Sequence, residues 1–198
     1  MTPRDILDKY PHLKTPEMMI CDYLLLEDLE MDILISNFNA SCTLLSRHFE
    51  LSAEAELAKA EILMGLHDHF LIKSLKKKIQ PMLILKDERE AAPHLTSSSI
   101  QAPFIVILVK QDFCTGVKDI RSASLMMEGR LVNSLTNPKA DQVAILLLAG
   151  YYSLNVEYPK VYADFMKSVE RIVVNQLDRA ASRCRKASWN QFLAMLQP

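Results

Sequence analysis

Glycine is scarce in this chain: only four of its 198 residues, Gly65, Gly116, Gly129 and Gly150, are glycines. Glycine forms tight turns, bulges and phosphate-binding loops, because it adopts left-handed backbone conformations at no steric cost. We therefore expect neither a many-stranded sandwich or barrel nor a P-loop enzyme. Apolar residues make up 49% of the chain and charged residues 24%, which is typical of a globular protein with a real core and argues against disorder.

Helix starts are marked clearly. Thr2, Thr15 and Asn137 each precede a proline, an arrangement that places a capping residue before a proline in the first helical turn. Ser52, followed by acidic residues, marks a fourth start. Between 158 and 184 the apolar residues recur at helical spacing. Together these signals predict helices at 3–10, 16–30, 31–49, 52–65, 66–80, 100–113, 117–135, 138–154, 158–184 and 188–197.

The region from 80 to 116 has two interpretations. Short apolar runs at 82–85 and 104–109, the second rich in β-branched residues, are compatible with two strands or with helical segments. We favour a helix over 100–113, because the flanking segments are predicted to be helical and an isolated pair of strands is only marginally stable. The polar, serine-rich stretch 86–102 predicts an exposed loop.

The fold class expected from these segments is all-α. About nine or ten helices would form stacked antiparallel hairpins in a single domain over 1–198, either armadillo- or HEAT-like or an irregular helical bundle. Two segments, 18–29 and 143–152, are apolar nearly all round and are therefore expected to be central helices.

The cysteines and the absence of targeting signals suggest an intracellular protein. The four cysteines are scattered without a CxxC pair, and the first residues show no basic region leading into an apolar stretch. The longest uncharged apolar run has ten residues, which is half of what a membrane-spanning helix needs. We expect reduced thiols, a cytoplasmic or nuclear location and no membrane partner. The glycine pattern of phosphate-binding loops is absent, and we expect no cofactor.

One short motif suggests metal chemistry. The sequence Gly65-Leu66-His67-Asp68-His69 follows an apolar helical run and resembles the central motif of the HD-domain metal phosphohydrolases, although the glycine and lysine that usually follow are missing. The resemblance implies an all-α fold in which imidazole and carboxylate groups bind a divalent metal that activates water. His67 and Asp68 would then be ligands, with His48 as the earlier ligand and Asp141 as the later one. The alternative is a partly exposed polar turn at a helix junction.

Two basic clusters are candidate contacts for a phosphate backbone or for an acidic partner segment. The alternative interpretation is a pair of solvated helix faces, and the net charge of -1 does not indicate a nucleic-acid partner. The clusters consist of Lys73, Lys76, Lys77 and Lys78, and of Arg179, Arg183, Arg185 and Lys186.

Ser188 follows basic residues in a pattern that basophilic kinases accept. A phosphate at a helix N-cap is electrostatically favourable, so Ser188 is a candidate phosphorylation site. The alternative is that Ser188 simply caps a short C-terminal helix.

These observations predict a non-enzymatic helical scaffold or adaptor that binds another protein, of unknown identity, within a larger complex. A helical subunit of a nucleic-acid-associated complex is the first alternative, and an HD-like phosphohydrolase is the second. Charge is uneven along the chain: residues 1–60 carry 11 acidic and 5 basic side chains, whereas residues 121–198 carry 6 and 10. Tyr151, Tyr152 and Tyr158 flank a short loop after the most apolar helix, and they are candidate interface anchors or simply pack the helix end.

Overall fold

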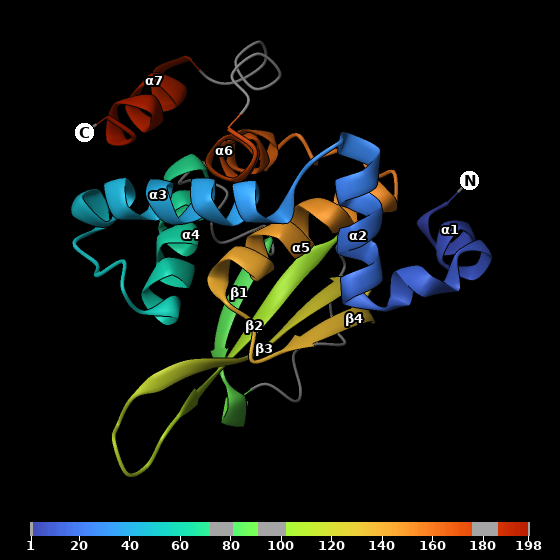
Figure 1. The fold of residues 1–198 in the computed structure, drawn as a ribbon, viewed down its shortest axis with the longest axis horizontal. Coiled ribbons are helices and arrows are strands. Elements are labelled where there is room, and N and C mark those ends of the chain that lie inside the picture. The colour runs from blue at the N-terminus through green and yellow to red at the C-terminus, as the bar shows by residue number, and fades with distance from the viewer. Residues whose placement is uncertain (1, 72–80, 91–101, 176–185, 198) are drawn as a thin grey trace.

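A computed structural model describes residues 2–71, 81–90, 102–175 and 186–197 (Figure 1). These residues form helices together with one four-stranded sheet, so the all-α expectation and the repeat of helical hairpins are wrong. The helical elements are α1 (Pro3–Lys9), η1 (Pro11–Lys14), α2 (Pro16–Glu27), α3 (Met31–Phe49), α4 (Glu56–Phe70), η2 (Glu88–Glu90), α5 (Ala140–Ser153), α6 (Ala163–Val173) and α7 (Lys186–Met195). The strands are β1 (Leu83–Asp87), β2 (Phe104–Gln111), β3 (Lys118–Met127) and β4 (Arg130–Thr136).

The sheet has the order β1-β2-β3-β4. Strands β1 and β2 are parallel, with Leu83 opposite Ile105, and β2, β3 and β4 are successively antiparallel. Of the two interpretations of the region from 80 to 116, the strand pair is therefore the correct one. The favoured helix over 100–113 is wrong, and β1 and η2 occupy the first part of the loop expected at 86–102.

Strand β2 shows why periodicity could not decide between helix and strand. Ile105 and Ile107 face the helices and belong to the main core, whereas Phe104 and Val106 point to the other face and pack with Met126 in a second buried cluster. A strand that is buried on both faces has a continuous apolar run instead of an alternating pattern. The same run is typical of a buried helix, so only the tertiary pairing distinguishes them.

The helix predicted over 117–135 is a β-hairpin. Glu128 and Gly129 both have positive φ angles, of 50° and 71°, between the paired residues Met127 and Arg130. Two left-handed residues in a two-residue connection match the right-handed twist of the flanking strands. Gly129 therefore marks the turn of this hairpin.

Most of the other predicted helices are confirmed, with small shifts of their bounds. Thr2 caps α1, since its Oγ1 accepts from the Asp5 amide at 3.2 Å and the Asp5 carboxylate accepts from the Thr2 amide at 2.7 Å. The break predicted between 65 and 66 is wrong, because α4 continues through Gly65. The parts of the predicted helices at 72–80 and 176–184, like the loop residues 91–101, lie outside the described residues.

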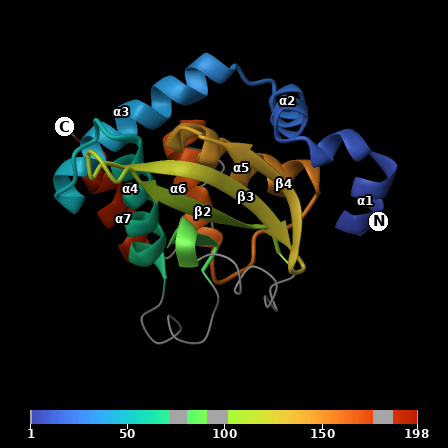
Figure 2. The same ribbon diagram turned by 90° about the horizontal axis from the view of Figure 1, so that it is seen from below.

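The helices gather on one side of the sheet, and α5 lies directly against it (Figures 1 and 2). Both α4 and α5 contact β3, α5 also contacts β2, and α2 contacts β4. Helix α5 is buried along nearly its whole length, which confirms it as a central helix. Helices α1 and α7 lie at opposite ends of the molecule. Within the described ranges, no helix combines the length and the apolar character needed to cross a bilayer.

Candidate functional site

His67 is a core residue of α4, so the partly exposed turn that we considered for it is wrong. Its side chain is buried, and its ring lies 5.6 Å from the ring of Tyr162 and 5.0 Å from that of Phe165. Its Nε2 accepts a hydrogen bond from the Met82 amide at 3.3 Å. His67 thus links α4 to the segment that enters β1.

The other three metal-ligand candidates lie in different surroundings. His48 is exposed near the end of α3, and Asp68 is exposed with its Oδ1 3.6 Å from Nδ1 of His67. Asp141 is buried in the first turn of α5. In the part of the chain that the structure describes, no three His, Cys, Asp or Glu side chains are placed to hold a metal ion, and the four candidates do not come together as a site.

Asp141 belongs to a polar cluster where α3, α4 and α5 meet. Glu56 Oε2 accepts from the Ala140 amide at 2.8 Å, while Lys59 Nζ donates to Glu56 Oε1 at 2.7 Å and to Asn39 Oδ1 at 2.8 Å. Removal from water raises the pKa of Asp141, and the negative charge of Glu56 adds to this effect. The Glu56 carboxylate thus provides a hydrogen-bond acceptor for the first amide of α5.

The remaining candidates from the sequence are only partly covered by the structure. All residues of the two basic clusters except Lys186 lie outside the described residues, and Lys186 is the first residue of α7. Ser188 is the third residue of α7 and is half-buried, so the helix begins two residues earlier than the capping interpretation assumed. Its phosphorylation stays a prediction.

Helix α2 exposes a broad apolar face, which is contrary to its expected central position. Leu25 is 83% exposed, Leu26 61% and Met18 47%, and Cys21 is also exposed. Met18, Cys21 and Leu25 lie at positions i, i+3 and i+7, which places them on one side of the helix with Leu26 at the margin. We call these four residues the α2 face.

The chain segment that carries the α2 face is negatively charged. Residues 15–46 contain six carboxylates and no lysine, arginine or histidine. Glu17 is exposed on the same side of α2, and Asp28, Glu30 and Asp32 are exposed where α2 connects to α3. Exposed apolar area with a rim of one charge is characteristic of an interaction surface.

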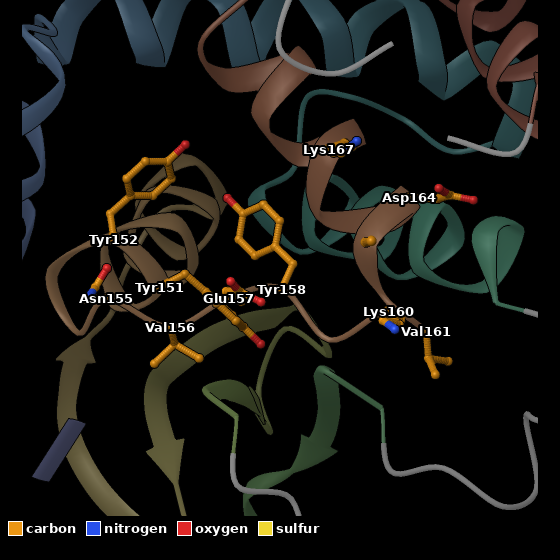
Figure 3. A pocket seen from close by; sticks show the side chains of 11 residues that line it. Tyr151, Tyr152, Asn155, Val156, Glu157, Tyr158, Lys160, Val161, Asp164 and Lys167 are labelled. Atoms are coloured by element: carbon orange, nitrogen blue, oxygen red, sulfur yellow. The ribbon is translucent and has the colours of Figure 1, made fainter. Parts of the chain in front are cut away.

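A second feature is a cavity of about 780 Å³ between the end of α5, the following loop and the start of α6. Figure 3 shows Tyr152 and Tyr158 on one side, with their hydroxyl groups turned toward one another, and Lys160, Asp164 and Lys167 on the other. Both hydroxyls donate to Oε1 of Glu170, at 2.8 Å from Tyr152 and 2.6 Å from Tyr158.

The sequence indicated these two features only in part. The apolar segment 18–29 was visible, but its exposure was not, because an evenly apolar helix does not show which side has neighbours. The tyrosines of 151–158 were visible as a group, whereas Glu170 belongs to the next helix and reaches them only in the folded chain.

Comparison of the chain with family models, with curated proteins and with solved structures found no significant match.

Proposed function

We propose that this protein is a non-enzymatic interaction module that binds a partner protein through the α2 face. The observation that carries the proposal is the exposure of Met18, Leu25 and Leu26 on one helix. Isolated exposed leucines are ordinary in soluble proteins, but apolar side chains gathered on one helix face are typical of a binding surface.

The negative charge of residues 15–46 indicates what kind of partner the α2 face would bind. The six carboxylates of residues 15–46 have no basic side chain in that segment to balance them. A partner that covers the α2 face would therefore carry lysine or arginine around an apolar stripe. A basic amphipathic helix has this composition, and two apolar helix faces pack well against each other.

The free state of the described cysteines is consistent with a partner in the cytosol or nucleus. Cys21, Cys42 and Cys114 are free thiols, and two of them, Cys21 and Cys114, are exposed. Exposed free thiols persist in reducing compartments. The location stays part of the proposal.

The proposal is tested with a synthetic amphipathic helix made of leucine and lysine, titrated against the full chain by fluorescence anisotropy. We expect saturable binding that weakens as salt rises, because the rim charges are exposed to solvent. Leu25→Ser combined with Leu26→Ser should weaken binding about tenfold or more. The two substitutions should leave stability nearly unchanged, because both side chains are mostly exposed.

The chain offers two internal controls. Leu131 on β4 is 61% exposed, as is Leu26, so Leu131→Ser removes a similar apolar surface elsewhere. Cys21 lies within the α2 face and Cys114 does not, so bound peptide should protect Cys21 but not Cys114 from alkylation. Equal binding of a peptide with the same residues in scrambled order, or equal weakening by Leu131→Ser, would contradict the proposal.

The nucleic-acid alternative rests on basic residues that, apart from Lys186, lie outside the described residues, and it stays a prediction. The phosphohydrolase alternative has no support from the positions of His48, His67, Asp68 and Asp141 described above.

A further inference from the structure

The cavity beside α6 has a preformed aromatic wall. The rings of Tyr151 and Tyr158 meet edge to face at 5.1 Å, and those of Tyr23 and Tyr152 lie 5.1 Å apart. The Tyr151 hydroxyl donates to the Pro103 carbonyl at 2.8 Å, which holds the wall to the start of β2. A volume of about 780 Å³ lies within the range of about 300–1,000 Å³ that is typical of small-molecule sites.

The wall offers hydrogen-bond acceptors and aromatic faces but no free hydroxyl hydrogen. A phenol has a single hydrogen, and those of Tyr152 and Tyr158 are both directed to Glu170. The remaining lone pairs of the hydroxyl oxygens are acceptors, and the faces of the rings carry negative electrostatic potential. A ligand that complements this wall is positively charged.

The charged groups around the cavity lead to the same conclusion. Lys160 and Lys167 line it together with Glu157 and Asp164, and Glu170 accepts hydrogen bonds from the two tyrosines. The four charged residues of the lining balance one another, and among the described residues Glu170 adds one negative charge next to the tyrosine hydroxyls, which favours a cation at that wall. Val156 and Val161 supply apolar lining next to the charged groups (Figure 3).

We propose that this cavity is a binding site for a small organic ammonium ion. The ammonium group would lie against Tyr152 and Tyr158, stabilised by the ring faces and by the Glu170 carboxylate behind them. The alkyl part of the ligand would contact Val156 and Val161. This site is separate from the α2 face, and the proposal does not depend on the proposed protein partner.

The protonation states of Tyr152 and Tyr158 are consistent with the binding of a cation. Burial raises the pKa of Tyr152 and of Tyr158, and the adjacent Glu170 carboxylate raises both further. Both phenols therefore stay neutral at physiological pH and keep their hydrogen bonds to Glu170. Neutral, hydrogen-bonded phenols are suited to holding a cation and are poor nucleophiles, so the site is assigned to binding and not to catalysis.

The test is a ligand-observed NMR titration of the full chain with choline and with its uncharged isostere 3,3-dimethylbutan-1-ol. The two compounds have nearly the same shape, so their difference in affinity measures the contribution of the positive charge. We expect choline to bind about tenfold more tightly than the isostere. Benzoate, as an anionic probe, should bind more weakly than choline.

Two substitutions report on the charge of the ligand. Glu170→Gln keeps an acceptor for the tyrosine hydroxyls but removes the negative charge, and it should weaken choline binding about fivefold. Lys160 is exposed at the cavity, and Lys160→Met should strengthen choline binding about twofold by removing a repulsive charge. Lys118→Met, which changes the net charge equally at an exposed position on β3, should leave choline binding unchanged.

Three results would overturn the proposal. The first is an absence of choline binding to a folded wild-type protein. The second is equal affinity for choline and its neutral isostere, which would indicate a purely apolar cavity. The third is tighter binding of benzoate that Lys160→Met weakens, which would identify an anion site instead.

Discussion

Asp141 is buried at the start of α5, and its Oδ1 has no hydrogen-bond partner among the described residues. Desolvation is the largest effect on its pKa and disfavours the ionised form, as does the charge of Glu56, whereas the Gln142 amide, Lys139 and Lys59 favour it. The pKa of this carboxyl is therefore raised in the folded state. A buried carboxylate with an incomplete set of partners costs stability at neutral pH.

The raised pKa of Asp141 predicts that the stability of the protein depends on pH. Because the pKa is raised in the folded state, the stabilising contribution of Asp141 is fully present below its unfolded pKa of about 3.9 and is lost as pH rises through the folded pKa. Asp141→Asn removes this titration. Urea unfolding should therefore show that the variant gains stability relative to wild type as pH rises from about 3.5 to 7.

Asp119→Asn, at an exposed position of β3, is the matched control and should show no such trend. A stability difference between Asp141→Asn and wild type that is constant with pH would contradict the prediction.

At the scale of the element, α6 is the clearest case of an amphipathic helix. Phe165, Val169, Ile172 and Val173 form its apolar stripe, and all four are buried, as their spacing predicts. The Phe165 ring also meets His67 of α4 edge to face at 5.0 Å. The stripe therefore carries contacts to neighbouring helices, and its loss should be costly.

Phe165→Ala should lower the free energy of unfolding by about 2–4 kcal/mol, because it removes a buried ring and leaves a cavity. Phe113→Ala is the matched control, since Phe113 is 81% exposed and its ring lies 4.5 Å from the Arg89 guanidinium. Its cost should stay within about 1 kcal/mol. Thermal or urea unfolding measures both, and equal costs would disprove the burial of the stripe.

At the scale of the whole molecule, two glycines sit where elements approach closely. A methyl group at Gly150 of α5 would lie 2.9 Å from the nearest Leu125 methyl of β3, and one at Gly65 of α4 would lie 2.7 Å from Phe49 Cε1 of α3. Leu125 is fully buried, whereas Phe49 is half-buried. The helix–sheet contact is therefore less able to adjust than the helix–helix contact.

Gly150→Ala should destabilise the protein by about 1–2 kcal/mol, because overpacking against Leu125 exceeds the gain of about 1 kcal/mol in helix propensity. Gly65→Ala has the same propensity gain, but Phe49 has room to move toward solvent, so its net effect should be close to zero. Urea unfolding of the two variants measures the difference. A smaller loss at Gly150 than at Gly65 would contradict this account of the packing.

Much of the helical part of the fold could be predicted from particular residues. Thr2 with Pro3, Thr15 with Pro16 and the stripe through Phe165 each act within one helix, so their pattern is visible in the chain. The candidate sites were much less predictable. The α2 face is exposed because no described element covers that side of α2, and the tyrosine cavity depends on Glu170, which belongs to another helix.

By itself, the sequence determined where α1, α2 and α3 begin and which side of α6 is apolar, because caps and periodicity are local properties. Only the tertiary structure decided that 104–111 is a strand, since an apolar run buried on two faces has the same pattern in a helix and in a central strand. It likewise decided that 118–127 and 130–136 pair as a hairpin. It also decided that α5 is central and α2 is not. Both helices are evenly apolar, and burial depends on how many neighbours pack against them, which no local pattern records.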